Sequence, residues 1–184
     1  MKTLDPSPTF QPSSEANGML PSDATLVQVF NEMSHELIST LMYLLGSRDD
    51  AQDVAQETFL KCWRTRENLG TVTNLRAWIF RVGLNTAKDL QRSAWNRKSK
   101  SFMGDDAMFM SPQESPLVTI EKREDLDRLR QAIMELRPEE KEVFLLRQNG
   151  GFTYEQIAEI RKSPVGTVKT QMRAALRKLR IVLN

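Results

Sequence analysis

The sequence predicts an all-α protein with two small helical domains joined by a flexible linker. Apolar residues recur every three or four positions along most of the chain, which is the period of amphipathic helices. No segment alternates apolar and polar residues as a strand would. Residues 99–117 interrupt the helical pattern with a glycine, two prolines and an acidic pair. We therefore expect this stretch to separate the two domains.

The chain has 184 residues, of which 40% are hydrophobic, enough for two packed cores. Residues 1–21 are rich in Pro, Ser and Asn and are predicted to form a disordered tail. They lack the apolar segment of a secretory signal, and no stretch of the chain approaches the ~20 apolar residues of a membrane span. Cys62 is the only cysteine, which excludes an intrachain disulfide and a cysteine zinc site. A cytoplasmic protein is expected.

The first predicted domain, 22–98, begins with two helices. The first spans 25–45, where Ser22 or Asp23 can cap its start and Gly46 can end it. Ser47 and Asp50 have the spacing of a capping box and begin the second helix. Its buried stripe is expected to comprise Ala51, Val54, Ala55, Thr58, Phe59 and Cys62. Its other side carries mainly acidic and amide groups.

A loop at 68–74 leads to the third helix of this domain. Thr73 or Asn74 can cap the start of that helix. Its inward side is expected to comprise Leu75, Trp78, Ile79, Val82 and Leu90. Residues 76–100 are strongly basic, with seven Lys and Arg against the single acid Asp89.

The second predicted domain, 118–184, holds four helices with clear end signals. The first spans 118–136, and its apolar positions are Ile120, Leu126, Leu129, Ile133 and Leu136. The other end signals are Pro138 and the Gly150–Gly151 pair for the second helix, a capping box of Thr153 and Gln156 for the third, and Ser163 with Pro164 for the fourth. Prolines at a first helical turn and glycines after a last turn are the usual positions of these residues.

The last two helices have the layout of a helix-turn-helix, with a tight turn at 161–163. The longer helix has one apolar face, made by Val165, Val168, Met172, Ala175, Leu176 and Leu179. Its opposite face and flanks carry Thr167, Lys169, Thr170, Gln171, Arg173, Ala174, Arg177 and Lys178. Hydroxyl, amide and cationic groups near the start of such a helix can contact base edges in the major groove. Ser163 and the first backbone amides suit a phosphate.

Charge is segregated in a way that supports a nucleic-acid partner. Residues 161–184 carry seven basic side chains and no acidic one, although the net charge of the whole chain is only +2. A single basic run is commonly a solvated helix face. Two separate basic runs together with the helix-turn-helix pattern favour two contacts with a polyanion.

Both halves of the chain resemble one protein family. The segments "DDAQDVAQETFLKCW" and "NLRAWIFRVGLNTAKDLQR" resemble region 2 of bacterial sigma factors. The segment from Glu135 to Arg180, "ELRPEEKEVFLLRQNGGFTYEQIAEIRKSPVGTVKTQMRAALRKLR", resembles region 4. The compact form, without regions 1 and 3, is similar to the extracytoplasmic-function group of the sigma-70 family. The resemblance covers roughly 23–180, and the two motifs in this order make it specific.

This resemblance implies a division of labour within region 2. The helix at 50–63 would dock on the clamp coiled coil of the RNA polymerase β′ subunit. The exposed groups implied are Asp50, Asp53, Gln56 and Glu57. The following helix would contact the −10 promoter element, where a non-template base leaves the stack for a polar pocket. The groups implied there are Asn85 and Lys88, with Arg76, Arg81, Arg92 and Arg97 on phosphates.

Two features of region 2 qualify this implied role. Trp78 is expected in the core, and Trp95 is expected to pack, although base stacking is the alternative. The loop at 68–74 lacks the aromatic cluster with which primary sigma factors open DNA. The chain should therefore melt DNA weakly and need a well-matched promoter.

Region 4 would contact the −35 element. Thr167, Lys169 and Thr170 match the family pattern, whereas Gln171 and Ala174 stand where Arg is common. Other contacts are expected from Ser163, Arg173, Arg177 and Lys178. The family also implies the β flap of RNA polymerase as a partner and an anti-sigma factor as an inhibitor, which would hold the chain at the membrane. The expected regulon is of the stress or envelope type, and no cofactor, metal or small-molecule ligand is expected.

Two other classes of function compete with a sigma factor. A stand-alone helix-turn-helix regulator would bind DNA without core polymerase, and the acidic helix at 50–63 would then have no role. An enzyme would need a catalytic group, and His35 with Cys62 is the only imaginable pair. His35 has no assembled acid partner, and Cys62 lies on a buried stripe. We expect no catalytic residues and no metal or redox sensor in the chain itself.

Overall fold

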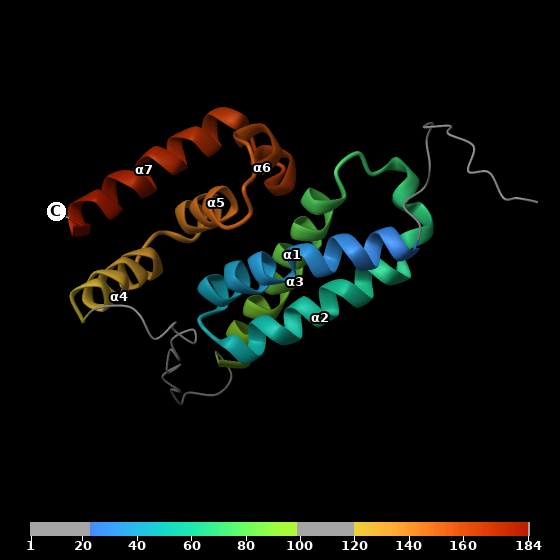
Figure 1. Cartoon of the computed structure of the whole chain (residues 1–184), viewed down its shortest axis with the longest axis horizontal. Coiled ribbons are helices and arrows are strands. Elements are labelled where there is room, and N and C mark those ends of the chain that lie inside the picture. Colours follow the sequence, from blue (N-terminus) through green and yellow to red (C-terminus); the bar gives the residue numbers. More distant parts are fainter. Residues whose placement is uncertain (1–22, 99–119, 184) are drawn as a thin grey trace, which may run out of the picture.

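The computed structural model describes residues 23–98 and 120–183, and every regular element in these ranges is a helix. The first group comprises α1 (Asp23–Leu45), α2 (Arg48–Arg64), the 3-10 helix η1 (Arg66–Thr71) and α3 (Leu75–Lys98). The second comprises α4 (Ile120–Met134), α5 (Pro138–Gln148), α6 (Tyr154–Arg161) and α7 (Val165–Leu183). Figure 1 shows the two groups side by side. The all-α prediction is confirmed, while the expected tail (1–21) and linker (99–117) lie outside the described residues.

Local capping explains where the N-terminal helices begin and end. Gly46 ends α1 with a left-handed φ of 72°, and its N–H donates to the Met42 carbonyl at 2.8 Å. The Ser47 hydroxyl accepts from the Asp50 N–H at 3.2 Å and caps α2. The Asn74 side chain accepts from the Ala77 N–H at 3.0 Å at the start of α3. These predicted caps are present.

The loop predicted at 68–74 is wrong in its first part, because 66–71 forms the 3-10 helix η1. Arg66 holds this turn: its guanidinium donates to the Trp63 carbonyl at 2.9 Å and to the Asp23 carboxylate at 3.0 Å. The same guanidinium lies 4.6 Å from the centre of the Trp63 ring. These contacts hold the start of η1 against the end of α2, where the chain passes from an α-helix into the tighter 3-10 helix.

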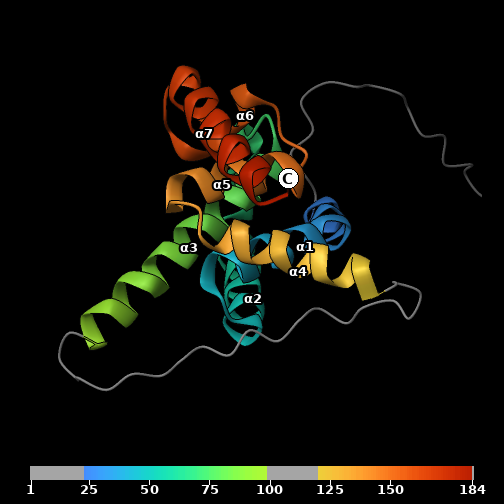
Figure 2. The ribbon, with the colours of Figure 1, turned by 90° about the vertical axis from the view of Figure 1, so that its left-hand side faces the viewer.

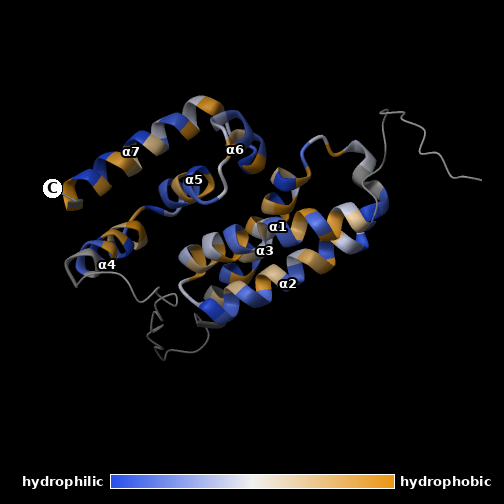
Figure 3. Cartoon of the chain, viewed as in Figure 1, coloured by the Kyte–Doolittle hydropathy of each residue, from blue (hydrophilic) through white to orange (hydrophobic). Residues whose placement is uncertain are grey.

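The three long N-terminal helices pack closely because of a glycine. A Cβ on Gly83 of α3 would lie 3.0 Å from Leu37 Cδ1 on α1 and 3.4 Å from Thr58 Oγ1 on α2. The buried stripe predicted for α2 is confirmed for Ala51, Val54, Ala55, Thr58 and Cys62. Phe59, also predicted there, is only partly buried and packs against Phe30 of α1. Figure 3 shows apolar residues concentrated where these helices face one another.

Helix α3 has a second buried side that the sequence analysis missed. Phe80 is fully buried and Leu84 is 2% exposed, although neither was expected inward. Phe80 meets Phe152, which precedes α6, edge to face at 4.9 Å between ring centres. The two helix groups therefore share one continuous core, in which Phe152 and Ile157 join residues of α1, α2 and α3.

The C-terminal helices follow most of their predicted end signals, but two of their predicted inward residues are exposed. Pro138 opens α5, Gly151 follows its end with a φ of 69°, and both hydrogen bonds of the Thr153–Gln156 capping box form. The predicted inward positions Leu126 and Leu176 are each 39% exposed instead. A small cluster between α4, α5 and α7 buries Ala132, Ile133, Leu136, Leu145, Ala175 and Leu179.

The view in Figure 2 shows how the groups are arranged in space. Helix α4 passes across α1, and the C-terminal half of α3 projects away from the other helices. Helix α7 lies at the outside of the molecule, beyond α5 and α6. The three helices singled out from the sequence, α2, α3 and α7, each keep one side directed away from the shared core.

Candidate nucleic-acid and polymerase interfaces

The helix-turn-helix predicted at the C-terminus is present as α6, a short turn and α7. The backbone of Lys162 makes the turn with φ 51° and ψ 49°, a left-handed conformation unusual outside glycine. Its N–H donates to the Ala158 and Glu159 carbonyls, and the Ser163 N–H donates to the Ala158 carbonyl at 3.0 Å. Val168, Met172 and Ile157 are buried and fix α7 on α6.

The outward side of α7 is open and cationic. Its exposed polar side chains are Thr167, Lys169, Thr170, Arg173 and Arg177, and the helix contains no acidic residue. Lys169 Nζ lies 5.9 Å from the centre of the Tyr154 ring, which orients its long side chain. The Thr170 hydroxyl donates to the Gly166 carbonyl at 2.9 Å. This side can face a polyanion without rearrangement.

Three other residues predicted for this surface are not freely presented. Gln171 accepts a hydrogen bond from the Arg161 guanidinium, and Lys178 Nζ lies 2.6 Å from the Glu140 carboxylate. The Ser163 hydroxyl is buried without a hydrogen-bond partner among the described residues, so the predicted Ser163 cap does not form. Helix α7 begins instead with the Val168 N–H donating to the Pro164 carbonyl at 3.2 Å.

The residues predicted for the −10 element lie along α3 in two environments. Asn85 and Arg92 are exposed, and Arg92 has only a loose ion pair with Asp89 at 3.7 Å. Arg76 and Lys88 instead contact the C-terminal helices, through the Gly150 carbonyl at 3.3 Å and the Glu142 carboxylate at 2.9 Å. Arg97 and Trp95 lie within α3, but their side chains are outside the described part of the chain.

A cavity that the sequence analysis missed lies at the start of α3. It has a volume of about 500 Å³. Asn74, Trp78 and Arg81 line it from the N-terminal helices, and Glu159 and Ile160 of α6 close its other side. Its walls offer an amide, a guanidinium and an aromatic ring. Only Arg81 and the loop at 68–74 had pointed to this place.

The acidic side predicted for α2 is present. Asp50, Asp53 and Gln56 are exposed, and Glu57 lies 4.0 Å from Arg64 with 43% of its side chain exposed. Asp50 also lies in the first turn of the helix, where a carboxylate is favoured by the helix dipole. The four residues share the side of α2 that faces away from the core.

An apolar groove borders this acidic side, and it was not expected from the sequence. It has a volume of about 660 Å³ between α1 and α2. Phe30 and Phe59, packed edge to face at 5.0 Å, form its floor, and Leu60 is 44% exposed at its edge. The signal in the sequence was Leu60, an apolar residue on the otherwise polar side of α2.

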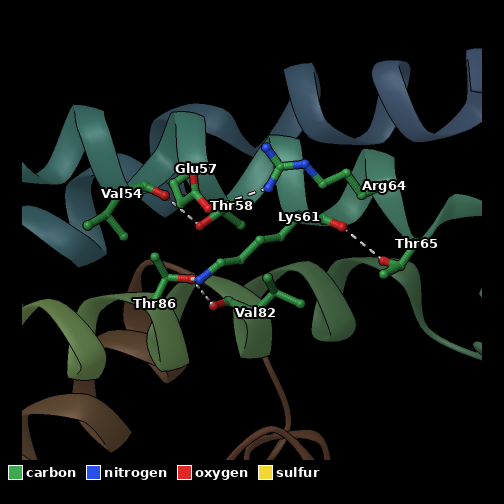
Figure 4. A network of polar contacts seen from close by, with 8 residues as sticks. All are labelled: Val54, Glu57, Thr58, Lys61, Arg64, Thr65, Val82 and Thr86. Atoms are coloured by element: carbon green, nitrogen blue, oxygen red, sulfur yellow. Dashed lines mark hydrogen bonds and ion pairs between the residues drawn. The ribbon is translucent and has the colours of Figure 1, made fainter.

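A polar network ties α2 to α3 (Figure 4). Lys61 of α2 reaches α3, where its ammonium donates to the Thr86 hydroxyl at 3.0 Å. That hydroxyl donates in turn to the Val82 carbonyl at 2.9 Å. These bonds therefore join α2 directly to the part of α3 that carries Asn85, the neighbour of Thr86.

Cys62 is a core residue, as predicted. It is fully buried, and burial raises the pKa of its thiol from 9.0 to about 12. His35 lies on α1 and is exposed. The described residues contain no group of three or more His, Cys, Asp and Glu side chains that could hold a metal ion. No helix in the described ranges is long and apolar enough to cross a membrane.

The thiol of Cys62 should resist alkylation at pH 8 in the folded chain. The thiolate is the reactive form, and a pKa of about 12 leaves almost none of it. Because the folded thiol holds its proton more tightly than the unfolded one, this group should destabilise the fold only as the pH rises above about 9. Labelling with a maleimide, followed by mass spectrometry, should be slow in buffer and fast in denaturant. Equal rates would contradict the burial.

Both halves of the chain match family models. The "Sigma-70 region 2" family matches residues 29–97, and the "Sigma-70, region 4" family matches residues 126–179. Similar curated proteins include the RNA polymerase sigma-H factor of Pseudomonas aeruginosa, 29% identical over 75% of this chain and 75% of that protein. ECF RNA polymerase sigma factor SigL of Mycobacterium tuberculosis is 29% identical over 91% of this chain and 94% of that protein. The ECF RNA polymerase sigma-E factor of Haemophilus influenzae is 31% identical over 73% and 75%.

Two solved structures share the fold. The sigma factor RpoE of Bartonella quintana, in complex with the anti-sigma factor NepR, gives a TM-score of 0.70 at 24% identity, over 87% of this chain and 94% of that one. CnrH, in complex with the cytosolic domain of CnrY, gives a TM-score of 0.64 at 22% identity, over 88% and 89%.

Region 2 followed by region 4 defines the class of this protein as an RNA polymerase sigma factor. The chain belongs to the extracytoplasmic-function group of the sigma-70 family. It is therefore a transcription initiation factor and not an enzyme, and its partners are core RNA polymerase and promoter DNA.

Proposed function

We propose that the two halves of the chain divide promoter recognition between them. Residues 118–184 bind the −35 element through α7, and residues 22–98 bind core polymerase through α2 and the −10 element through α3. The observation that carries this proposal is the outward side of α7. It lies on the second helix of a helix-turn-helix and presents exposed Thr, Lys and Arg side chains without any acid.

The polymerase contact is proposed for α2 and the groove beside it. Asp50, Asp53, Gln56 and Glu57 supply charge complementarity to a basic partner, which sets orientation and association rate. The neighbouring groove with Leu60 at its edge supplies apolar area that a partner can desolvate. Both features suit the β′ clamp coiled coil, and region 4 is proposed to contact the β flap.

The −10 contact is proposed for the exposed side of α3 and the cavity at its start. Asn85 and Arg92 are available to a single strand, and Arg81 lies in the wall of the cavity. An amide, a cation and a ring are the groups that hold an unstacked base and its phosphate. Since the loop at 68–74 has no aromatic cluster, DNA opening should depend on a well-matched promoter.

Regulation by an anti-sigma factor in the cytoplasm is proposed as well. The sigma factor RpoE is bound to the anti-sigma factor NepR, and CnrH is bound to the cytosolic domain of CnrY. We propose that this chain is likewise held inactive until a signal, of the stress or envelope type, releases it. A membrane-bound partner would then place the chain at the inner face of the membrane.

The test of the proposed function is a pull-down of core RNA polymerase, followed by run-off transcription from a promoter library. Stable binding with initiation at one class of −35 and −10 pairs is the expected result. A second candidate, a stand-alone regulator, is favoured by one observation, since the outward side of α7 is open in the free chain. Tight binding to duplex DNA without polymerase binding would support that candidate.

Lys169→Ala and Arg177→Ala should each weaken binding to the −35 duplex by about 1–3 kcal/mol. Both side chains are exposed on α7 and can reach base edges or phosphates. Fluorescence anisotropy across a salt series measures this effect. If the residue contacts phosphate, the slope of log affinity against log salt should fall by about 1 per variant.

Two controls separate the roles of the helices. Arg180→Ala removes the same charge from the exposed last turn of α7 and should leave −35 binding within about 0.5 kcal/mol. Asn85→Ala should impair −10 opening while leaving −35 binding intact, which permanganate footprinting of the holoenzyme can report. If Asn85→Ala and Lys169→Ala failed at the same step, this assignment of roles would be wrong.

A further inference from the structure

The contact between the two halves of the chain covers part of α3, the helix assigned to the −10 element. Phe80 of α3 is buried against Phe152, and the Asn149 amide donates to the Ser39 hydroxyl of α1 at 3.2 Å. The Arg76 guanidinium donates to the Gly150 carbonyl and lies 6.0 Å from the centre of the Phe152 ring. The C-terminal residues in these contacts, Asn149, Gly150 and Phe152, all follow the end of α5.

A buried carboxylate lies at the centre of this contact. Only 6% of the Glu142 side chain is exposed, and each of its oxygens faces a cation from a different half of the chain. Lys88 Nζ of α3 lies 2.9 Å from one oxygen, and Arg161 Nε of α6 lies 3.5 Å from the other. The same arginine donates to Gln171 of α7. Four side chains therefore join α3, α5, α6 and α7 in one network.

The closed contact depends on the pairing of this carboxylate. A buried carboxylate is costly unless it is paired, and Lys88 is the partner that the N-terminal half supplies. Separating the halves leaves Glu142 with Arg161 as its one cationic partner among those described. The Lys88 side chain is 49% exposed, which weakens its share of the pair. Backbone phosphates are the groups that can replace Glu142 at Lys88.

The closed contact and binding of a DNA strand use the same groups on α3. Arg76 and Lys88 are bonded to the C-terminal helices, and Arg81 lines a cavity whose outer wall is Glu159 and Ile160. The outward side of α7, by contrast, is exposed. The contact between the two halves therefore covers part of the surface proposed for the −10 element, and it leaves the surface proposed for the −35 element open.

We propose that this contact, fastened by Glu142 between Lys88 and Arg161, is autoinhibitory: in the free chain α5 and α6 mask the −10 surface of α3 and leave the −35 surface of α7 open. The inference rests on the proposed role of α3. It makes separation of the two halves a required step before a single strand can engage Arg76, Arg81 and Lys88 in addition to the exposed groups of α3. The −35 duplex binds without that step.

The fastening by Glu142 is tested by distances between spin labels on the full chain. Cysteines replacing the exposed His35 of α1 and Glu155 of α6 take the labels, and the buried Cys62 stays unlabelled. Glu142→Gln keeps the size of the side chain and removes its charge. It should reduce the ratio of closed to open chains on the order of threefold to tenfold.

Glu140→Gln is the matched control for this measurement. Glu140 is a buried carboxylate on the same helix, but its partner Lys178 belongs to the C-terminal helices themselves. This variant should leave the distance distribution unchanged. Identical distributions in the unmodified chain and in Glu142→Gln would overturn the role of Glu142.

Masking is tested by closing the contact permanently. Ser39 and Asn149, whose side chains are hydrogen-bonded at 3.2 Å, are both replaced with cysteine, and a short bifunctional maleimide joins the two thiols. The probes are the single-stranded −10 segment and the −35 duplex of the promoter recovered by run-off transcription. Cross-linking should weaken binding of the single strand at least about tenfold and leave duplex binding within about twofold.

The outcomes distinguish the inference from the function on which it rests. Equal single-strand binding with and without the cross-link would overturn autoinhibition while leaving the −10 role in place. If neither the uncross-linked chain nor its complex with core polymerase bound the −10 segment, the proposed role of α3 would be wrong. The proposal of autoinhibition would then be wrong as well. The proposal is supported if the free chain binds the −10 segment weakly, if Glu142→Gln strengthens this binding, and if the cross-link abolishes it.

Discussion

Phe80→Ala is expected to lower the free energy of unfolding by about 3–5 kcal/mol, the usual cost of removing a buried ring. Phe80 of α3 is completely buried, and its ring packs against the ring of Phe152. Because the shared core runs through this contact, the two halves of the unmodified chain should unfold in one transition. The variant should lose this coupling and show two transitions.

The tryptophans make the separation measurable. All three, Trp63, Trp78 and Trp95, precede residue 99, so their fluorescence reports unfolding of the N-terminal half, and that of Trp78 also reports loss of the cavity that it shares with α6. Far-ultraviolet circular dichroism reports the helices of both halves. In urea titrations the two signals should coincide for the unmodified chain and diverge for Phe80→Ala.

Phe59→Ala is the matched control for this prediction. Phe59 packs against Phe30 and Trp63 on the far side of the N-terminal helices, and it is only partly buried. Its loss should lower stability while the two signals still coincide. Coincident signals in Phe80→Ala would show that the halves are coupled elsewhere, and separate signals in the unmodified chain would show that they are not coupled at all.

Features set by neighbouring residues were predictable from the sequence. The caps at Ser47, Asn74 and Thr153 each depend on a hydrogen bond that spans three residues. The outward directions of Asp50, Asp53, Lys169 and Arg177 follow from helical period alone. For these positions the local pattern contains all the information that the fold uses.

Features set by distant packing were not predictable. The helical period of the apolar residues predicted one inward side for α3. Packing of the C-terminal helices buries a second side at Phe80 and Leu84. Glu142 resembles a surface residue in the sequence "PEEKEV", and its burial depends on Lys88, 54 residues away. Lys61 likewise crosses to α3 instead of joining the outer side of α2.

The same distinction between local pattern and distant packing holds for the candidate sites. The sequence identified the helices that carry them, and it identified the residues whose side chains point away from the core. It did not show that Gln171, Lys178, Arg76 and Lys88 are engaged within the chain, because each partner lies on another helix or beyond the end of α5. Of these engagements, those of Arg76 and Lys88 join the two halves of the chain.

Asp53→Lys is expected to weaken binding to core polymerase by about 2–4 kcal/mol, because a basic partner would then meet a like charge. Asp53 is exposed on α2 beside Asp50 and Gln56, and the described residues show no bond that its loss would break. The fold should therefore survive. Biolayer interferometry with immobilised core polymerase measures the loss, and run-off transcription should fall in parallel.

The control for Asp53→Lys is Glu155→Lys, which makes the same change of charge at an exposed residue on α6. Glu155→Lys should leave polymerase binding within about 0.5 kcal/mol. Both variants should retain −35 duplex binding, since neither residue lies on α7. If the two substitutions weakened polymerase binding equally, the effect would come from net charge and not from α2. If Asp53→Lys had no effect, the docking surface would lie elsewhere, and the apolar groove at Leu60 would be the next surface to test.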